Sequence, residues 1–536
     1  MRKRWADFWT DELARRCGCI GVRPGADADT EVTGLVYDSR QAREGAVYFA
    51  LAGLHADGHD FIGEAVARGA GVVVHEKELP AYPGTALYVR VKDARFAMSP
   101  VADAFYGQPS RRLVTVGVTG TEGKSTTVSL IFQLLSLLGR KAGFISTVQY
   151  SVDGTAHDNP EHQTTPEATV IHRQLAEMAD NGLEFAVIES SSHGLSRRTN
   201  RLGDVRFDVG VMTNVTHEHL EFHGTWEQYR DDKANLFRAA EKFCVVNADD
   251  PSADYFTGLA CVPVFSFSSS FSSDGSDAGI FIRNIVPTST GNRYEIYRHR
   301  SEPAGTLIED RLPGAFNAGN VAATLLTVAG LLNMPIEALA PYAGRLQPVR
   351  GRMTAVHSGG ENGQTGPGGQ AEPDFEVLVD YAHTPSSFET IFPPLRARLD
   401  AASGGDGNIR RRIIAVFGSA GERDRQKRPL QGRIAARWSD IIILTDEDPR
   451  GEEPMDILRE IAAGIEPPNA WTEGRNLFLI PDRPAAITKA VSLAERGDIV
   501  LLLGKGHENS IIYRDHTDRY DEISCAQAIL KNRQSR

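Results

Sequence analysis

The sequence predicts a three-domain α/β protein, and three observations point to it. The chain has 536 residues, and at about 150 residues per domain this length suits three or four domains. Short apolar runs of strand length alternate with helix-like segments, which is typical of mainly parallel sheets covered by helices on both faces. A glycine-rich turn joins one such strand to its helix. The domain ranges that we expect are 1–109, 110–346 and 347–536.

The composition indicates a folded chain and argues against several classes of protein. Hydrophobic residues make up 41% and charged residues 24%, which is ordinary for a globular protein. The 58 basic and 70 acidic residues leave a net charge of −12, whereas a general nucleic-acid binder needs clustered cations. No apolar run is long enough to predict a membrane span.

The first residues and the cysteines predict a cytoplasmic location. Asp7, Asp11 and Glu12 interrupt any apolar core that a signal peptide would need. The five cysteines are scattered and lack the spacing of metal ligands. Free thiols of this kind are typical of a reducing compartment.

The first domain is predicted to be a mixed α/β unit. Its strand-length apolar runs, each flanked by turn residues, lie at 34–37, 47–51, 71–75 and 86–91. A helix-like stretch at 60–68 lies among them. Gln108, Pro109 and Ser110 form the expected linker, since proline disfavours helical geometry in the residue before it.

The second and third domains repeat the strand–helix alternation. In the second, a strand at 113–118 precedes a glycine-rich turn and a helix at 125–138, and further strand-like runs lie at 185–189, 209–213, 243–247 and 262–267. In the third, the strand-like runs lie at 376–380, 412–417, 440–444, 477–480 and 499–503. Three Gly- and Ser-rich segments, 266–279, 358–373 and 402–408, are expected to be surface insertions.

The strongest functional signal is the glycine-rich turn of the second domain. Its residues are Gly120, Thr121, Glu122, Gly123, Lys124, Ser125 and Thr126. A strand precedes this G-K-S sequence and a helix follows it, which is the context of a phosphate-binding loop. Glycines let backbone N–H groups converge on phosphate, and the helix N-terminus adds partial positive charge. We expect Lys124 to neutralise phosphates, and Ser125 or Thr126 to offer an oxygen to Mg²⁺.

The spacing G-x-x-G-K-S is shorter than the common form, and it resembles the loop of the Mur ligase superfamily, G-T-N-G-K-T. Those enzymes join an amino acid to a carboxylate at the expense of ATP. The resemblance implies a central P-loop ATPase domain and a Rossmann-like last domain. Glu122 stands where the family has asparagine. A carboxylate there would weaken nucleotide binding by repulsion if it faced the phosphates.

Further family-like segments predict a magnesium site. The segment 186–196 carries Glu189, and 213–224 carries His219. Carboxylate and imidazole groups at strand ends suit a divalent cation. The segment 229–237 resembles the one whose lysine is carbamylated in the family, and Lys233 matches that lysine. By itself Lys233 has the pattern of a helix-surface lysine. The metal ligands implied are Ser125, Glu189, His219 and carbamylated Lys233.

The resemblance also implies three nucleotide contacts and a first substrate. Asn317 matches the adenine-side position, Arg352 an ATP-contacting arginine, and His383 the histidine of a Y-A-H-x-P element. The segment 37–62 resembles the family's uridine-nucleotide-binding domain. The substrate-binding positions implied in the first two domains are Ser39, Leu54, His55, Ala56, Gln163, Thr164, Thr165, Ser191 and Arg197. Arg201 is the alternative to Arg197, because the spacing departs from the family there.

In the third domain, the resemblance implies an amino-acid site. The matching positions are Arg423, Glu447, Asp448, Pro449, Arg450, Gly504 and Glu508. Arg423 would bind the carboxylate of the incoming amino acid bidentately. Arg450 would suit the distal carboxylate of diaminopimelate, whereas Asp446 and Asp448 would suit the bare ammonium of lysine or ornithine. We favour a diamino acid with one carboxylate.

The implied function is ADP-forming ligation of a diamino acid to UDP-N-acetylmuramoyl-L-alanyl-D-glutamate, a step of peptidoglycan precursor synthesis that passes through an acyl phosphate. The catalytic residues implied are Lys124, Lys233, His219 and Glu189. We expect a monomer with ATP and Mg²⁺ as cofactors. Two alternatives stay open: another ligase of the superfamily, such as a folylpolyglutamate synthase, and a catalytically silent nucleotide-binding homologue, which Glu122 suggests.

Overall fold

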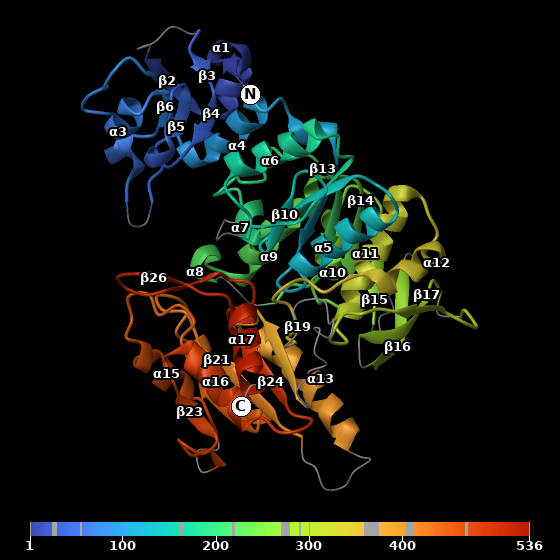
Figure 1. Ribbon diagram of the computed structural model, residues 1–536. Coiled ribbons are helices and arrows are strands. Elements are labelled where there is room, and N and C mark those ends of the chain that lie inside the picture. Colours follow the sequence, from blue (N-terminus) through green and yellow to red (C-terminus); the bar gives the residue numbers. More distant parts are fainter. Residues whose placement is uncertain are drawn as a thin grey trace. The chain divides into compact units, whose positions relative to one another are not determined.

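The computed structural model describes residues 2–23, 29–53, 56–159, 164–216, 220–269, 279–288, 291–299, 301–357, 375–403, 411–466 and 470–534. Figure 1 shows its helices and strands. Its contacts divide the chain into two compact units. One unit comprises Met1–Phe281 and Ala322–Leu339, and the other comprises Ile282–Val321 and Ala340–Arg536. Both units are built from helices and parallel-rich sheets, so the predicted α/β class is confirmed. The predicted domain boundaries stay a prediction.

The first sheet of the chain has five strands in the order β2-β7-β6-β5-β4. The strands are β2 (Cys19–Arg23), β4 (Gly34–Val36), β5 (Ala46–Phe49), β6 (Ala70–His75) and β7 (Leu87–Val91). Strands β4 to β7 are parallel and match the four predicted runs. Strand β2 was not predicted, because this edge strand pairs antiparallel and buries little of its length.

Helices cover both faces of this sheet. They are α1 (Trp5–Phe8), α2 (Asp11–Arg16) and α4 (Ala94–Phe105) on one face and α3 (Ile62–Ala67) on the other. A short pair, β1 (Lys3–Arg4) and β3 (Glu31–Val32), adds a separate ribbon. The 3₁₀ turns of the chain are Ser39–Gln41, Gly58–Phe61, Pro109–Arg112 and Ala340–Arg345.

A parallel sheet with the order β9-β12-β8-β13-β14-β15 forms the centre of the first unit. Its strands are β8 (Val114–Thr119), β9 (Ala142–Ile145), β12 (Phe185–Glu189), β13 (Phe207–Met212), β14 (Ala240–Asn247) and β15 (Val264–Ser268). Strands β10 (Gln149–Ser151) and β11 (His157–Asp158) extend one edge antiparallel. The predicted strands of this region are all present.

The helices of this region are α5 (Lys124–Leu137), α6 (Ala168–Asp180), α7 (Ser192–Leu195), α8 (Leu220–His223), α9 (Trp226–Ala239), α10 (Ala253–Leu259), α11 (Asn317–Leu332) and α12 (Ile336–Leu339). The apolar core beside the sheet includes Ile188, Phe207, Leu236 and Phe237. Helix α5 begins within one residue of the predicted helix.

Strands β16 (Gly279–Pro287), β17 (Asn292–Tyr297) and β18 (Thr306–Glu309) continue the strand order, and β17 and β18 form an antiparallel pair. None of the three was predicted from the sequence. The predicted bounds of the surface insertion at 266–279 are wrong at both ends, because Ser266 to Ser268 belong to β15 and Gly279 begins β16. The predicted insertion at 358–373 lies outside the described residues, as does most of 402–408.

The last sheet has the order β19-β20-β24-β21-β22-β23. Its strands are β19 (Thr354–Ala355), β20 (Glu376–Asp380), β21 (Ile413–Phe417), β22 (Ile441–Leu444), β23 (Leu477–Leu479) and β24 (Ile499–Leu503), all parallel except β19. Helices α13 (Pro385–Ser403), α14 (Lys427–Trp438) and α15 (Pro454–Ala462) cover one face. Helices α16 (Arg483–Leu493) and α17 (Glu522–Gln534) cover the other, as in a Rossmann-like domain. Strands β25 (Ser510–Ile512) and β26 (Thr517–Arg519) form a hairpin.

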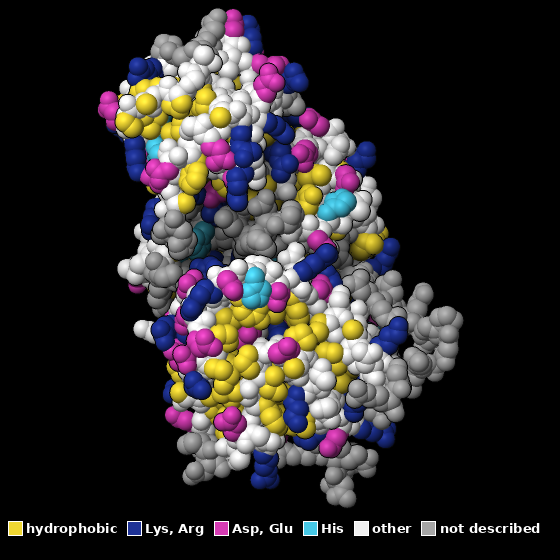
Figure 2. Space-filling model, turned by 60° about the vertical axis from the view of Figure 1, so that its left-hand side comes forward, with side chains coloured by type: hydrophobic (Ala, Val, Ile, Leu, Met, Phe, Trp, Pro, Cys, Tyr) yellow, Lys and Arg dark blue, Asp and Glu magenta, His cyan; other side chains and the backbone are white. Residues whose placement is uncertain are grey.

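Two observations bear on the partners that we expect, one on helix length and composition and one on surface charge. Within the described residues, no single helix is long and apolar enough to cross a membrane, and only the bent pair Asn317–Leu332 and Ile336–Arg345 passes by length and composition. On the face seen in Figure 2, basic and acidic side chains are interspersed, and neither sign dominates.

A buried polar pair lies between helices α4 and α6. Asp103 on α4 is 5% exposed, and its carboxylate lies 3.7 Å from Nδ1 of the fully buried His172 on α6. Burial raises the pKa of Asp103 to about 6, and the neighbouring Asp204 adds to the shift. Burial lowers the pKa of His172 to about 3, so the imidazole is neutral and does not offset the carboxylate.

We expect Asp103→Asn to stabilise the protein more at pH 8 than at pH 4.5. A carboxyl whose pKa is raised by folding favours the folded state below its unfolded pKa of about 3.9 and loses that contribution as the pH rises through 6. The gain at pH 8 should approach about 2 kcal/mol, measured as the difference in thermal unfolding between variant and wild type. The exposed Asp254→Asn should show no such pH dependence, and equal effects of Asp103→Asn at both pH values would contradict the account.

Candidate active site

The loops after three neighbouring strands meet at one edge of the central sheet. Strand β8 lies between β12 and β13, with Val118 opposite Glu189 and Thr119 opposite Met212. Parallel strands in register end at the same edge, where α/β proteins place their ligands. The loop after β8 is the predicted phosphate-binding loop, and the other two carry Glu189 and Asn214.

Close contact with the β13 loop holds the phosphate-binding loop in shape. A Cβ atom at Gly120 would lie 1.9 Å from Oγ1 of Thr213, so only glycine fits. The side-chain oxygen of Asn214 accepts a hydrogen bond from the Glu122 N–H (2.8 Å), and its amide nitrogen donates to the Glu122 carbonyl (3.1 Å). Thr213 Oγ1 donates to the same carbonyl (2.6 Å). The unusual residue Glu122 is therefore anchored through its backbone.

Lys124 and Ser125 open helix α5, directly after Gly123 in the left-handed conformation (φ 81°). The Lys124 ammonium donates to the carbonyl of Thr121 in its own loop (2.7 Å). Ser125 Oγ donates to the Glu189 carboxylate (3.0 Å). Thr126 is the next residue of α5 and is partly buried. The first N–H groups of a helix have no partner within the helix, which leaves them for an anion.

Glu189 is the central carboxylate of this edge and is 1% exposed. Its second oxygen accepts hydrogen bonds from Ser146 Oγ (2.7 Å) and from the Thr147 N–H (2.9 Å). The hydroxyl of Ser125 and the carboxylate of Glu189 are hard oxygen donors of the kind that Mg²⁺ prefers. His219 lies outside the described residues, and within the described ones no three His, Cys, Asp or Glu side chains gather to hold a metal.

Lys233 is not the surface lysine that its helical pattern alone predicts. It is 1% exposed on α9, and its ammonium donates to the carbonyl of Gly120 (2.5 Å). It lies 4.5 Å from the ring centre of Tyr229, whose hydroxyl is 3.0 Å from Thr121 Oγ1. Lys233 therefore contacts the phosphate-binding loop. Its carbamylation and its role as a metal ligand stay predictions.

Two of the predicted substrate residues of the second domain, Thr165 and Ser191, lie next to Glu189. Thr165 Oγ1 donates to the Glu189 carbonyl (2.9 Å) and lies 2.8 Å from Ser191 Oγ. Ser191 also caps α7 by accepting from the Gly194 N–H (3.1 Å). Thr164 is partly buried next to Thr165, and Gln163 lies outside the described residues.

The arginine that contacts this segment is Arg201 and not the favoured Arg197. Arg201 donates to the Thr165 carbonyl (2.8 Å) and to the Glu167 carboxylate (3.0 Å). Arg95 from α4 binds the same Glu167 oxygen (2.5 Å). Arg197 is exposed. The sequence could not decide between the two arginines, because only the fold shows which one faces inward.

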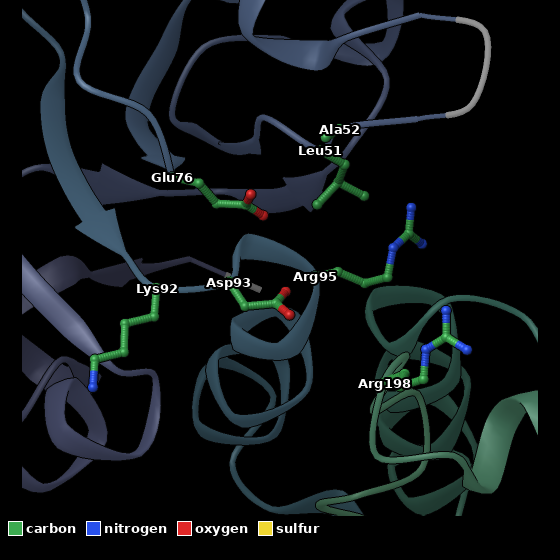
Figure 3. Close-up of a pocket in the computed structure, with 7 residues that line it drawn as sticks. All are labelled: Leu51, Ala52, Glu76, Lys92, Asp93, Arg95 and Arg198. Atoms are coloured by element: carbon green, nitrogen blue, oxygen red, sulfur yellow. The ribbon is translucent and has the colours of Figure 1, made fainter. Parts of the chain in front are cut away.

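A polar pocket of about 240 Å³ lies beside this network. Its lining residues are Leu51, Ala52, Glu76, Lys92, Asp93, Arg95 and Arg198. Figure 3 shows Arg198 extending toward Arg95 across the pocket. None of these residues was predicted, since single cations outside a motif carry no signal in the sequence.

The predicted uridine-side residues have mainly local contacts. Ser39 Oγ donates to the Glu64 carboxylate (3.1 Å), and the Ala56 carbonyl accepts from the Gly53 N–H (3.0 Å). Leu54 and His55 lie outside the described residues.

The second unit contains the three residues that we expect to contact the nucleotide. Asn317 donates its amide to the Pro313 carbonyl (2.7 Å) at the start of α11. The guanidinium of Arg352 lies 4.7 Å from the ring centre of Tyr381. His383 Nδ1 lies 2.9 Å from the Tyr381 carbonyl oxygen. Arg352 and His383 thus share Tyr381 as a neighbour.

The predicted amino-acid loops follow β22 and β24 in the last sheet. Glu447 and Asp448 are buried, each 7% exposed. Arg450 has a left-handed backbone (φ 54°) after Pro449, and its N–H donates to the Ile512 carbonyl (2.9 Å). Burial raises the pKa of Asp446 to about 6. Arg423, in the turn after β21, is exposed.

Asp448 is not the free partner for a substrate ammonium that we expected. Its carboxylate already accepts from the Lys505 ammonium (2.9 Å) and from the Ile512 N–H (3.0 Å). Lys505 also donates to Glu508 (2.5 Å). Gly504, next to Lys505, has φ 103°, and a Cβ there would lie 3.1 Å from the Glu447 carboxylate. Lys505 was not among the predicted residues, although it lies inside the G-K-G-H-E segment.

Three family models match the chain in order. They are described as the Mur ligase family catalytic domain (residues 31–106), the Mur ligase middle domain (118–328) and the Mur ligase glutamate ligase domain (369–506). The chain is also 47% identical over 524 residues to a UDP-N-acetylmuramyl-tripeptide synthetase of Treponema denticola, covering 93% of this chain and 94% of that protein. The chain belongs to the Mur ligase family.

Two further similarities support this membership. A UDP-N-acetylmuramoyl-L-alanyl-D-glutamate–2,6-diaminopimelate ligase of Geobacillus kaustophilus is 36% identical over 522 residues, covering 96% of this chain and 97% of that protein. A solved structure of a ligase with the same name has a TM-score of 0.60 and 25% identity, covering 99% of both chains. The predicted resemblance is confirmed, and this Mur ligase is an enzyme of the three-domain Mur type.

We expect Gly120→Ala to destabilise the first unit. The added Cβ would meet Thr213 Oγ1 at 1.9 Å, and its backbone has φ 152°. Such overpacking typically costs about 1–3 kcal/mol. Thermal unfolding of the variant measures the loss. Gly258→Ala is the matched control, since nothing lies within 4 Å of a Cβ there; equal stability of the two variants would contradict the described loop contact.

Proposed function

We propose that this Mur ligase adds a diamino acid to UDP-N-acetylmuramoyl-L-alanyl-D-glutamate, with ATP converted to ADP, during peptidoglycan precursor synthesis. The observation that carries the proposal is the meeting of Lys124, Ser125 and Glu189 at the carboxyl edge of the central sheet. The names of relatives that are 47% and 36% identical over nearly the whole chain support the same reaction.

The residues of the first unit fit a magnesium–nucleotide complex. Gly120 and Gly123 allow the close backbone approach that phosphates need, and the N-terminus of α5 faces the same loop. Lys124 would exchange the Thr121 carbonyl for phosphate oxygens. Ser125 and Glu189 would hold Mg²⁺, which when bound neutralises the charge of the phosphates. We further propose His219 and carbamylated Lys233 as metal ligands, and Asn317, Arg352 and His383 as nucleotide contacts.

The chemistry that we propose has two steps. The γ-carboxylate of D-glutamate takes the terminal phosphoryl group and becomes an acyl phosphate, and the amino group of the diamino acid then displaces phosphate. The protein contributes mainly position and charge neutralisation, as in other phosphoryl transfers. Thr165, Ser191 and Arg201 form a network around Glu189 that would orient the acceptor carboxylate.

The pocket between Arg95 and Arg198 is a suitable place for the anionic part of the UDP-substrate. Three cations, Lys92, Arg95 and Arg198, outnumber the two carboxylates of the lining, Glu76 and Asp93, so the pocket is locally positive although the chain as a whole is acidic. Ser39, Leu54, His55 and Ala56 are the uridine-side residues that we propose with it. We also propose the domain ranges 1–109, 110–346 and 347–536, a monomer and a cytoplasmic location.

The defining experiment is a ligation assay with the UDP-muramoyl dipeptide, ATP and each of lysine, ornithine and meso-diaminopimelate. We expect a tripeptide product with one of them, and a diamino acid with one carboxylate is our choice. Product with glutamate on a folate substrate, or ATP binding without phosphate release under all substrates, would replace the proposal by one of the alternatives named above.

We expect Lys124→Ala to lower substrate-dependent ADP release at least ~100-fold, because one preorganised cation at a transferring phosphoryl group contributes about that much. Thermal unfolding should stay close to that of the wild type, since the lysine's described hydrogen bond lies within its own loop. The exposed Lys141→Ala is the control and should keep full activity. Substrate-dependent turnover of Lys124→Ala at the wild-type rate would overturn the assignment.

We expect Arg201→Ala to raise KM for the UDP-substrate about tenfold or more, whereas Arg197→Ala should change it less than about twofold. Arg201 contributes two hydrogen bonds, one of them to a carboxylate, and such charge-assisted bonds are worth about 1.5–3 kcal/mol. Steady-state kinetics of both variants measure the difference. A larger increase of this KM in Arg197→Ala than in Arg201→Ala would instead support Arg197 as the substrate-binding arginine.

A further inference from the structure

A buried lysine joins the two acidic loops of the last domain. Lys505 follows β24 and is 1% exposed. Its ammonium donates to Asp448 in the loop after β22 (2.9 Å) and to Glu508 in its own loop (2.5 Å). Asp448 and Glu508 thus come from different strands and share a single cation. Tyr381, from the loop after β20, donates its hydroxyl to the other oxygen of Glu508 (3.3 Å).

The Lys505 ammonium is charged in this setting. Burial alone would lower the pKa of Lys505, but Glu508 and Asp448 outweigh burial and hold that pKa above its ordinary value. Lys505 and Asp448 are buried, whereas Glu508 is partly exposed. A buried cation paired with a buried carboxylate is costly to disrupt, since removal of one partner leaves unpaired charge. The three side chains therefore form one unit that fixes the two loops against each other.

One oxygen of the Glu447 carboxylate accepts no hydrogen bond from the described residues. Glu447 is 7% exposed, and its Oε2 is buried without a hydrogen-bond partner among the described residues. Burial alone would raise the pKa of Glu447, but the surrounding cations, led by Lys427, hold that pKa below its ordinary value. A buried, ionised carboxylate with an unmade hydrogen bond is suited to a cationic ligand.

We propose that Lys505 is a positioning residue of the diamino-acid site: it occupies the ammonium position between Asp448 and Glu508, so that the substrate's amino group is received by Glu447. This inference rests on the proposed function. In it, Asp448 and Glu508 act through Lys505, and they set the distance between the loops after β22 and β24. The specificity for the amino acid then depends on a lysine that makes no contact of its own with it.

The test uses full-length Lys505→Ala, in which the ammonium position becomes vacant. We expect KM for the diamino acid to rise at least ~10-fold, with KM for ATP and for the UDP-substrate changed less than ~2-fold. Added propylammonium, which carries the missing charge, should restore ligation in a saturable way, whereas it should not activate the wild type. Formation of the tripeptide product is followed by mass, so that any product of propylamine itself is counted separately. Lys505→Arg should retain more activity than Lys505→Ala.

Arg412→Met is the matched control. The Arg412 guanidinium binds the buried Asp498 carboxylate (2.7 Å). These two residues directly precede β21 and β24, at the end of the strands opposite to Lys505. We expect Arg412→Met to lower the unfolding temperature without a selective change in KM for the diamino acid. If Lys505→Ala behaves like this control, with lost stability, unselective kinetics and no response to propylammonium, Lys505 is only structural and the inference fails.

Failure of the proposed function gives a different result. In that case wild-type protein forms no tripeptide with any diamino acid. If the wild type is active and Lys505→Ala is too unstable to assay, Lys505→Arg decides alone, since a guanidinium keeps the charge but not the geometry. A selective increase of KM for the diamino acid in Lys505→Arg supports the inference, and unchanged kinetics contradict it.

Discussion

The parallel register of β12, β8 and β13 is the constraint on which the active site depends. It ends three loops at one edge, so that Gly120 contacts Thr213 and Ser125 contacts Glu189. No one of these loops holds its shape alone. The phosphate-binding loop is short, and its backbone is fixed by the side chain of Asn214 from the next strand. The chemistry of this Mur ligase therefore depends on strand pairing as much as on the motif.

Carboxylates of the two units are stabilised in a similar way, by hydrogen bonds and ion pairs to neighbouring groups. Glu189 has a hydroxyl, a second hydroxyl and an N–H around it, whereas Asp448 and Glu508 share Lys505. Glu189 and Asp448 are thus each held by partners from other loops, which makes them fixed electrostatic features and not flexible side chains. Such preorganised charge is what ligation through phosphoryl transfer needs.

Much of the fold follows from local sequence, and less of the site does. The strand before Gly120 and the helix after it are clear because buried parallel strands are continuous apolar runs and the G-K-S motif marks the helix start. Strands β2, β9, β16, β17 and β18 were not predicted. Strand β9 has only four residues, and edge and antiparallel strands carry weaker patterns. Tertiary contacts that no motif encodes decide which of Arg197, Arg198 and Arg201 faces inward. They also decide which group binds Asp448.

The central claim is that a triphosphate lies against the backbone of the loop that ends at Lys124. A crystal structure with Mg²⁺, a non-hydrolysable ATP analogue and the UDP-muramoyl dipeptide tests it most directly. The account predicts phosphate oxygens at the N-terminus of α5, Mg²⁺ next to Ser125 and Glu189, and the Lys124 ammonium moved from the Thr121 carbonyl to phosphate. A triphosphate bound elsewhere, with the bond from Lys124 to Thr121 retained, would contradict it.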